Sequence, residues 1–321
     1  MRGEDIAYAT HLVVSENFVS SIVGNFSMLP FEILACPSCN GPLITHGAGL
    51  GCVACALSYS NASTGALDLR LQRSKTYSVD HVVRPGTKER SVPSLEVLHP
   101  APKPEVDFSG WRVPARLEAG LVTHIPRAQT PGSLALDLGC GTTVHRPVLE
   151  HAGYRYVGMD YSDAGAPILA DGQAIPVCSE TMEFVLSISV LQYVSDPLLV
   201  LREAYRVLKP GGRLLGTVAF LEPCNHTYFH QTHLGAGVLL ESAGFDVERL
   251  MVHPQWTVLR AQLGMGLFPK MPDLIARAIV APLELLHRAW WVAGGMVRKS
   301  ATPLGRITAT AGSIAFLAVK R

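Results

Sequence analysis

The sequence has few charged residues and almost no net charge. Charged residues make up 17% of the 321 residues, and 27 lysines and arginines stand against 26 aspartates and glutamates, for a formal net charge of +1. This balance does not indicate a broad basic surface for nucleic acid. No run of about 20 apolar residues is free of charge, so no membrane-spanning helix is predicted.

A secretory leader is also missing from the pattern of residues 1–27, which lack a basic segment followed by a clean apolar core. We therefore expect a cytoplasmic protein. Two interpretations of residues 1–30 remain open: an N-terminal arm ahead of the folded chain, or translation that begins at Met28. Hydrophobic residues make up 48% of the chain, which is enough for a large core, and the length accommodates two domains.

Four of the seven cysteines have the spacing of a metal site. They form two Cys-x-x-Cys pairs with twelve residues between the pairs: Cys36, Cys39, Cys52 and Cys55. Two such turns can direct four thiolates at one tetrahedral Zn²⁺, and without an export signal zinc is favoured over disulfides. Four thiolates leave no open coordination position, so we predict a structural role.

The segment 31–72 is similar to the zinc ribbons fused before methyltransferase domains, including the tRNA-methyltransferase-activator type. Besides the cysteines, the resemblance rests on Tyr59 and on the tail Gly65–Arg70. A module of about 40 residues buries too little surface to fold without such help. Residues 73–130 are predicted as a linker and cap region, with a helix over 106–125.

An apolar strand runs from Leu134 directly into a turn with two glycines, Gly139–Gly141. A buried parallel strand has this composition, and glycines at its carboxyl end let the chain turn tightly and a ligand approach. The next strand ends in Asp160, where an acid commonly accepts hydrogen bonds from a ribose diol. A dinucleotide fingerprint needs a third glycine, but Val144 stands at that position.

Four motifs in this order resemble class I S-adenosylmethionine-dependent methyltransferases of the type 11-like group. They are the acid-Leu-Gly-x-Gly turn, the segments 170–176 and 182–194, and the string from Glu203 to Gly212. The resemblance implies an α/β, Rossmann-like, seven-stranded sheet over residues 131–321, whose last strand closes the sheet as an antiparallel hairpin. It also implies a helical insertion over 253–311, before that strand.

The resemblance further implies that S-adenosylmethionine is the cofactor. Its methionine part would lie on the first loop, its ribose on Asp160, and its adenine on Asp171 and the backbone of Gly172. Ser187 and Ile188 would line the site of methyl transfer. The full set of predicted cofactor residues is Asp137, Gly139, Cys140, Gly141, Asp160, Tyr161, Asp171, Gly172, Ser187 and Ile188.

Three histidines follow the predicted fifth strand, at the edge where ligands of open α/β sheets bind. They are His226, His230 and His233. His226 or His230 could be the base that an oxygen acceptor needs near pH 7. The three could also bind a metal, or line a pocket without taking part in chemistry, and these interpretations remain open.

The insertion contains a predicted helix over 270–297 with a narrow polar stripe on an otherwise apolar surface. Pro282 is expected to kink or split it. Three roles fit such a helix: packing as a core or lid element, contact with a membrane surface or a lipid-linked substrate, and a homodimer seam.

The sequence as a whole predicts an S-adenosylmethionine-dependent methyltransferase with an N-terminal zinc ribbon. A small-molecule or a lipid- or sugar-linked substrate, methylated on oxygen, is favoured. Methylation of ribosomal or transfer RNA is the first alternative, although the near-neutral charge argues against nucleic acid. A non-catalytic, cofactor-binding partner of another methyltransferase is the second.

Overall fold

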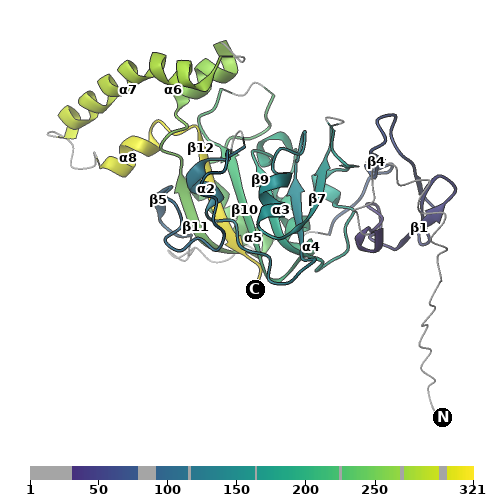
Figure 1. The fold of residues 1–321 in the computed structure, drawn as a ribbon. Helices are drawn as coiled ribbons and strands as arrows, with labels where there is room; N and C mark the ends of the chain where they lie inside the picture. The colour runs from purple at the N-terminus through teal and green to yellow at the C-terminus, as the bar shows by residue number, and fades with distance from the viewer. Residues whose placement is uncertain are drawn as a thin grey trace.

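The computed structural model describes residues 31–78, 92–114, 117–162, 165–223, 226–267, 271–295 and 302–321. The predicted arm, with Met28, lies outside these residues. Within them, one mixed sheet of nine strands forms the centre of the molecule (Figure 1). From edge to edge its strands are β4 (Leu67–Asp68), β8 (Ile168–Leu169), β7 (Arg155–Asp160), β6 (Leu134–Leu138), β9 (Met182–Ile188), β10 (Leu208–Ala219), β12 (Ser313–Val319), β11 (Asp246–Val252) and β5 (Leu95–Val97).

The centre of the sheet is parallel and fully buried. Every residue of β6 and β9 is buried, as expected of strands covered on both faces. The last strand, β12, lies between β10 and β11 and is antiparallel to both. The predicted α/β fold with its antiparallel last strand is therefore confirmed.

The sheet is wider than predicted because each edge gains one short strand. β4 belongs to the predicted ribbon and pairs in parallel with β8, with Leu67 opposite Ile168. β5 belongs to the predicted linker and pairs in parallel with β11, with Leu95 opposite Leu250. Both additions cover backbone groups that an open sheet edge would leave unpaired.

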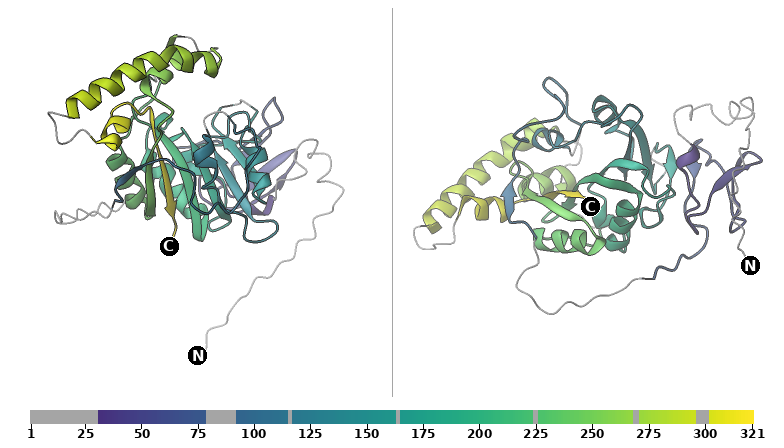
Figure 2. Two further views of the ribbon diagram at one scale, coloured as in Figure 1. Left: turned by 60° about the vertical axis from the view of Figure 1, so that its left-hand side comes forward. Right: turned by 90° about the horizontal axis from the view of Figure 1, so that it is seen from below.

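Helices cover both faces of the sheet (Figure 2). On one face α4 (Pro197–Val207) and α5 (His233–Ala243) pack on side chains such as Leu136 and Val185. On the other, α2 (Ala119–Val122) and α3 (Arg146–His151) pack on neighbours in the same strands, such as Ala135 and Phe184. Alternate residues of each strand thus build two cores, as the pleat requires.

Local signals set the ends of α4 and α5. Asp196 caps α4 by accepting hydrogen bonds from the amides of Leu198 and Leu199, each at 3.1 Å, and Pro197 is the first helical residue. Gly244 ends α5 in the left-handed region, at φ 106°. Short helical turns η2 (Gly172–Ala174) and η3 (Leu191–Tyr193) connect the strands at the carboxyl edge of the sheet.

The predicted helix over 106–125 is wrong in length. Within the described part of this segment only α2 is helical, and Gly110 turns the chain at φ 77° ahead of Pro114. Proline and a left-handed glycine both oppose a continuous helix. The segment still packs on the sheet, because Val106 and Phe108 are buried in the core beside α3.

The insertion before β12 is helical, as predicted. It contains α6 (Val258–Ala261), the π-helical turn η4 (Gln262–Leu267), α7 (Asp273–Gly295) and α8 (Pro303–Thr308). Pro282 does not split α7, which runs as one helix across it. In the described part of the chain no helix is both long enough and apolar enough to cross a bilayer.

The cysteine-rich segment packs against one end of the sheet, and α7 lies toward the other end (Figures 1 and 2). The cysteine-rich segment begins with η1 (Phe31–Ile33). It forms a small antiparallel sheet from β1 (Leu43–His46), β2 (Gly49–Cys52) and β3 (Ser58–Tyr59). Leu34 forms a bridge with Val177, and both belong to the same hydrophobic core as β6. The ribbon segment is therefore packed into the main core.

Candidate functional site

The first loop after β6 is built around two glycines with different constraints. Gly139 has φ 75°, and a Cβ there would lie 2.3 Å from Cγ2 of Val190. Gly141 has φ 49°, and a Cβ there would meet no atom within 4 Å. The amides of Gly139 and Cys140 donate to the carbonyl of Met159, at 2.9 and 3.0 Å, which ties the loop to β7. The two glycines thus form a cradle that is held against β7 and is open at Gly141.

Asp137 lies beneath this loop and is fully buried. Its carboxylate accepts a hydrogen bond from Tyr156 Oη at 2.9 Å and lies 3.3 Å from Nδ1 of His145. Burial and the nearby Asp137 carboxylate raise the pKa of Tyr156, which keeps the phenol protonated as a donor. Asp137 therefore fixes the side chains under the loop, and buried His145 Nε2 has no partner among the described residues.

Asp160, at the end of β7, holds the far side of the loop. One carboxylate oxygen accepts from the Gly141 amide at 2.9 Å, and the other from the amide and hydroxyl of Ser162, at 2.9 and 2.8 Å. Tyr161 beside it is 65% exposed, and the guanidinium carbon of Arg70 lies 5.8 Å from the centre of its ring. Arg70 comes from the ribbon tail, so the ribbon reaches the predicted cofactor edge.

Asp171 and Gly172 form the next turn along this edge. Asp171 caps η2 by accepting a hydrogen bond from the Gln173 amide at 2.8 Å. A Cβ on Gly172 would be in ordinary contact with Leu138 and Val200, at 3.6 Å. The turn therefore packs on the loop strand β6 and on α4, beside the glycine cradle.

Ser187 and Ile188 end β9 and are both buried. The hydroxyl of Ser187 and both amide atoms of Gln192 are buried, and no described residue hydrogen-bonds to them. Buried polar atoms normally have partners, and unsatisfied ones point to a missing ligand or water. With the open glycine cradle, these groups fit a polar nucleoside-type cofactor at the carboxyl ends of β6, β7 and β9.

A cavity of about 640 Å³ continues from this edge toward the insertion. Ser189 and Thr217 line it at the carboxyl ends of β9 and β10, and Ser313 lines it at the start of β12. Leu117 and Met271 close it from the α2 segment and from the insertion. Cavities of 300–1,000 Å³ with a few polar groups are typical of small-molecule sites.

A histidine–glutamate pair stands in the wall of this cavity. His253 directly follows β11, is 2% exposed, and lies with Nδ1 3.0 Å from a carboxylate oxygen of Glu118. Glu118 directly precedes α2, but its side chain does not cap that helix; its carboxylate contacts His253 instead. If Nδ1–H of His253 donates to Glu118, Nε2 is a hydrogen-bond acceptor. No described residue donates a hydrogen bond to it.

Two arginines and a glutamate complete the polar part of the wall. Trp256 donates its indole N–H to Glu222 at 2.6 Å, and the guanidinium carbon of Arg260 lies 5.9 Å from the centre of the same indole. Arg260 is only 8% exposed, and Arg277 joins it from α7. The insertion therefore supplies both apolar walls and positive charge to the cavity.

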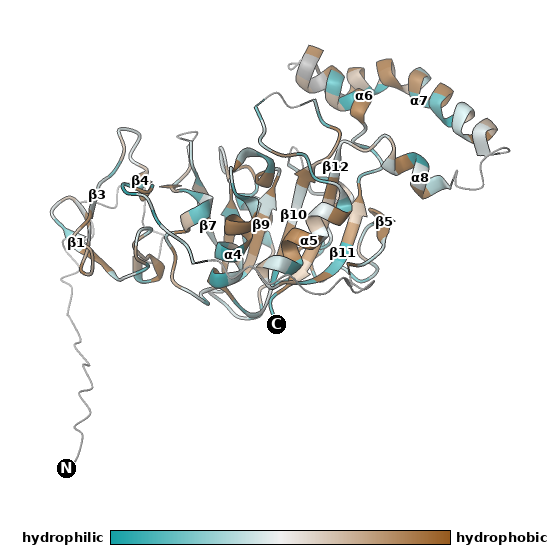
Figure 3. Ribbon diagram, turned by 180° about the vertical axis from the view of Figure 1, so that it is seen from behind, coloured by the Kyte–Doolittle hydropathy of each residue, from teal (hydrophilic) through white to brown (hydrophobic). Residues whose placement is uncertain are grey.

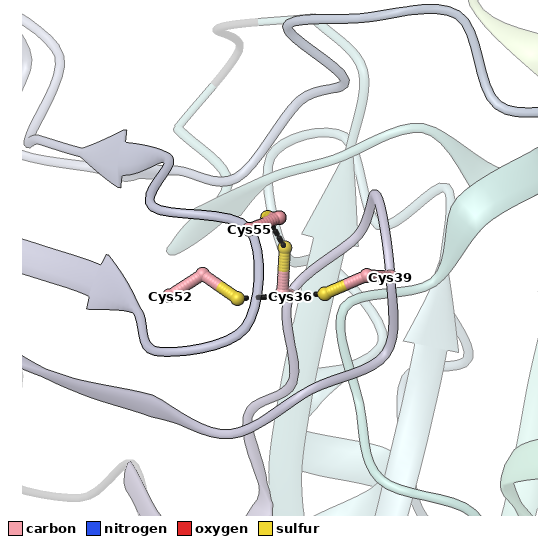
Figure 4. A group of neighbouring side chains, drawn as sticks. All are labelled: Cys36, Cys39, Cys52 and Cys55. Carbon is pink, nitrogen blue, oxygen red and sulfur yellow. Dashed lines mark hydrogen bonds between the residues drawn. The ribbon is translucent and has the colours of Figure 1, made fainter.

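The four cysteines of the ribbon converge on one point (Figure 4). All four Sγ atoms lie within 4.8 Å of one another, and the Cys36–Cys55 and Cys39–Cys52 pairs are 3.6 and 3.4 Å apart. Tetrahedral zinc with bonds of about 2.3 Å separates its sulfurs by about 3.8 Å, so the donor set fits this ion. Burial opposes ionisation of Cys36, but hydrogen bonds from Tyr59 and the backbone outweigh it and lower its pKa to about 7.

Comparison with known proteins finds one family model that matches the central part of the sheet. Residues 136–216, which run from β6 into β10, match the family model described as a methyltransferase domain. This segment, residues 136–216, is therefore similar to a methyltransferase domain and takes that name. The matched residues include the glycine loop, Asp160, Asp171 and the end of β9.

Known proteins that match this part of the chain share low identity with it. The ubiquinone biosynthesis O-methyltransferase of Ruegeria pomeroyi is 26% identical over 37% of this chain and 51% of its own length. The malonyl-[acyl-carrier protein] O-methyltransferase of Alcanivorax borkumensis is 31% identical over 36% of this chain and 47% of its own length. The chain thus spans about half the length of these curated relatives.

Solved structures resemble the chain over a larger part of its length. One chain of a complex containing the Haloferax volcanii Trm112 methyltransferase activator is 18% identical, with a TM-score of 0.43. The match covers 64% of this chain and 89% of that one. The Haemonchus contortus phosphoethanolamine N-methyltransferase 2, solved with S-adenosyl-L-methionine, is 19% identical with a TM-score of 0.39, covering 60% of this chain and 50% of that one.

The histidines singled out from the sequence lie away from this cavity. His226 and His230 are exposed, and Nε2 of His230 lies 3.0 Å from the Thr227 hydroxyl. His233 begins α5, and partial burial lowers its pKa. The described wall of the cavity includes none of the three. His253 was missed because no local motif marks a histidine whose partner, Glu118, lies far away in the sequence.

Proposed function

We propose that the chain is an S-adenosylmethionine-dependent methyltransferase that methylates a hydroxyl oxygen of a small molecule or a lipid- or sugar-linked metabolite. The observation that carries the proposal is the position of the cavity. It opens at the carboxyl ends of β9 and β10, and Ser189 in its wall is followed by Val190, whose side chain faces Gly139 of the first loop. Cofactor and acceptor would therefore meet at the end of β9.

The residues of the first loop and its neighbours would hold the cofactor. Gly139, Cys140 and Gly141 would carry the methionine part, with Asp137 shaping the loop from below. Asp160 and Tyr161 would lie along the ribose, Asp171 and Gly172 along the adenine, and Ser187 and Ile188 beside the transferring methyl group. When bound, the cofactor supplies an electrophilic methyl group on its sulfonium.

His253 would act as the general base. Glu118 orients the ring by binding Nδ1–H, which leaves Nε2 to accept the proton of the acceptor hydroxyl as its oxygen takes the methyl group. The reaction is an in-line displacement, so the walls contribute mainly by positioning the two reactants. Aliphatic and methionine side chains beside the polar pair suit an acceptor with an apolar body.

A structural zinc ion would be held by Cys36, Cys39, Cys52 and Cys55. The support is the convergence of four thiol groups at tetrahedral spacing in a module with little core of its own. The ion would hold the ribbon, and with it β4 and Arg70, against the cofactor edge.

The test is cofactor binding followed by methyl transfer. Titration calorimetry of the whole chain should find one S-adenosylmethionine site, and labelled methyl groups should pass from the cofactor into a compound of a metabolite extract. Label that enters only RNA would favour the alternative that the chain methylates ribosomal or transfer RNA. Absence of cofactor binding would refute the proposal altogether.

Replacing Gly139 by alanine should weaken S-adenosylmethionine binding about 10-fold or more. The new Cβ would be strained at φ 75° and would collide with Val190, so the loop must move. The measurement is the dissociation constant by calorimetry. Gly132→Ala is the matched control, because Gly132 has φ 88° but open space around its Cβ position. Equal loss of affinity in both variants would mean that backbone strain alone, and not the loop, controls binding.

A further inference from the structure

The long helix α7 has one side toward the protein and a much larger side toward solvent. Ala276 and Val280 are buried, Glu284 accepts a hydrogen bond from Thr257 at 2.5 Å, and Trp291 donates to the Thr302 carbonyl at 3.2 Å. Successive positions in this set are four, four and seven residues apart, so they form the inner side of the helix. Its inner side also lines the cavity, through Ala276.

The solvent side of α7 carries many large apolar side chains, and Figure 3 shows hydrophobic residues recurring along the helix. Its large side chains are 49–80% exposed: Leu274, Ile275, Ile279, Leu283, Leu285, Leu286, Trp290 and Val292. At 3.6 residues per turn they cover an arc of about half the helix circumference. Monomeric proteins rarely expose a contiguous apolar surface of this kind without a partner.

The charges beside this apolar arc are positive. Among the α7 side chains that the structure describes, Arg277 and Arg288 are the exposed charged ones, and both lie along one border of the arc. The acidic Glu284 faces inward, where it bonds to Thr257. The solvent side therefore combines apolar residues, a tryptophan and bordering cations.

We propose that α7 binds flat on the surface of an anionic lipid bilayer. Interfacial helices insert an apolar face among the acyl chains while bordering arginines reach the lipid phosphates. A second copy of the chain fits less well, because a helix–helix seam covers a stripe much narrower than half the circumference. The cavity, on the other side of α7, would then lie next to the membrane, where acceptors with apolar tails are concentrated.

The experiment is sedimentation of the whole chain with vesicles, without cofactor or acceptor, so its outcome is independent of the proposed function. Vesicles of equal parts phosphatidylcholine and phosphatidylglycerol should bind the protein about 10-fold better than phosphatidylcholine alone, and 0.5 M salt should reduce binding. The triple variant Leu285→Ser/Leu286→Ser/Trp290→Ser should bind the anionic vesicles about 10-fold more weakly, or weaker still. Ile44→Ser/Leu234→Ser, which changes exposed apolar residues elsewhere, should bind like the parent.

Arg288→Glu provides a second test that leaves the apolar arc intact. It should selectively reduce binding to the anionic vesicles. Vesicle binding that is unchanged in both the triple variant and Arg288→Glu would overturn the proposal. The proposal would also be overturned if the parent chain did not bind vesicles but formed a dimer in light scattering, and the triple variant were monomeric. That result would make α7 a self-association surface.

Discussion

Replacing His253 by alanine should lower the rate of methyl transfer about 100- to 10,000-fold, the range that a lost general base accounts for. The ring is held by Glu118 at 3.0 Å in the wall of the cavity, and its Nε2 has no other described partner. S-adenosylmethionine should bind His253→Ala with parental affinity, because His253 stands on the acceptor side of the cavity. The measurements are single-turnover label transfer and cofactor calorimetry.

Three controls separate a base from a structural histidine. Glu118→Gln should lower the rate of methyl transfer about 10-fold, because the His253 ring loses the carboxylate that orients it but keeps Nε2 as the proton acceptor. Added imidazole should partly restore His253→Ala, which a merely structural role would not allow. His226→Ala and His230→Ala should transfer methyl groups at the parental rate. If one of them abolishes transfer while His253→Ala does not, the histidine after the fifth strand is the base and His253 is not.

Replacing Cys36 by serine should release zinc and lower the first unfolding transition by roughly 10 °C, since the free energy of metal binding to such modules is free energy of folding. The effect should extend beyond the ribbon. Leu34 and Leu69 share the core of the methyltransferase domain, and β4 pairs with β8, so an unfolded ribbon exposes the sheet edge. Metal analysis and thermal unfolding by circular dichroism measure the two effects.

Cys178→Ser is the matched control for this variant. Cys178 is half-buried and its amide bonds to the ribbon residue Ile33, but its thiol lies outside the cluster of four. This variant should keep one zinc per chain and the parental transition. Full zinc content and unchanged unfolding in Cys36→Ser would contradict the proposed metal site. Chelation of the parent should reproduce the Cys36→Ser result and should also weaken S-adenosylmethionine binding, because Arg70 beside Tyr161 moves with the ribbon.

The parts of the fold that the sequence predicted correctly depend on residues close together in the chain. The predicted apolar strand with its turn at Gly139 is decided within a few residues, and so are the start of α4 at Asp196-Pro197 and the end of α5 at Gly244 that the structure shows. Propensity, capping and glycine conformation act over that distance, so their signals can be seen without the fold. The helix predicted over 106–125 failed because the left-handed Gly110 and Pro114 interrupt the segment, so that only α2 is helical in its described part.

By itself the sequence determined the α/β class, the order of motifs in the methyltransferase domain and the cysteine set of the ribbon, because each is carried by local composition and spacing. Only the tertiary structure joined β4 and β5 to the sheet edges, turned the apolar side of α7 to solvent, and brought Glu118 and His253 within 3.0 Å. The reason is that pairing of distant segments depends on which surfaces remain free after the core has formed. That information belongs to the packed chain and not to any short stretch of it.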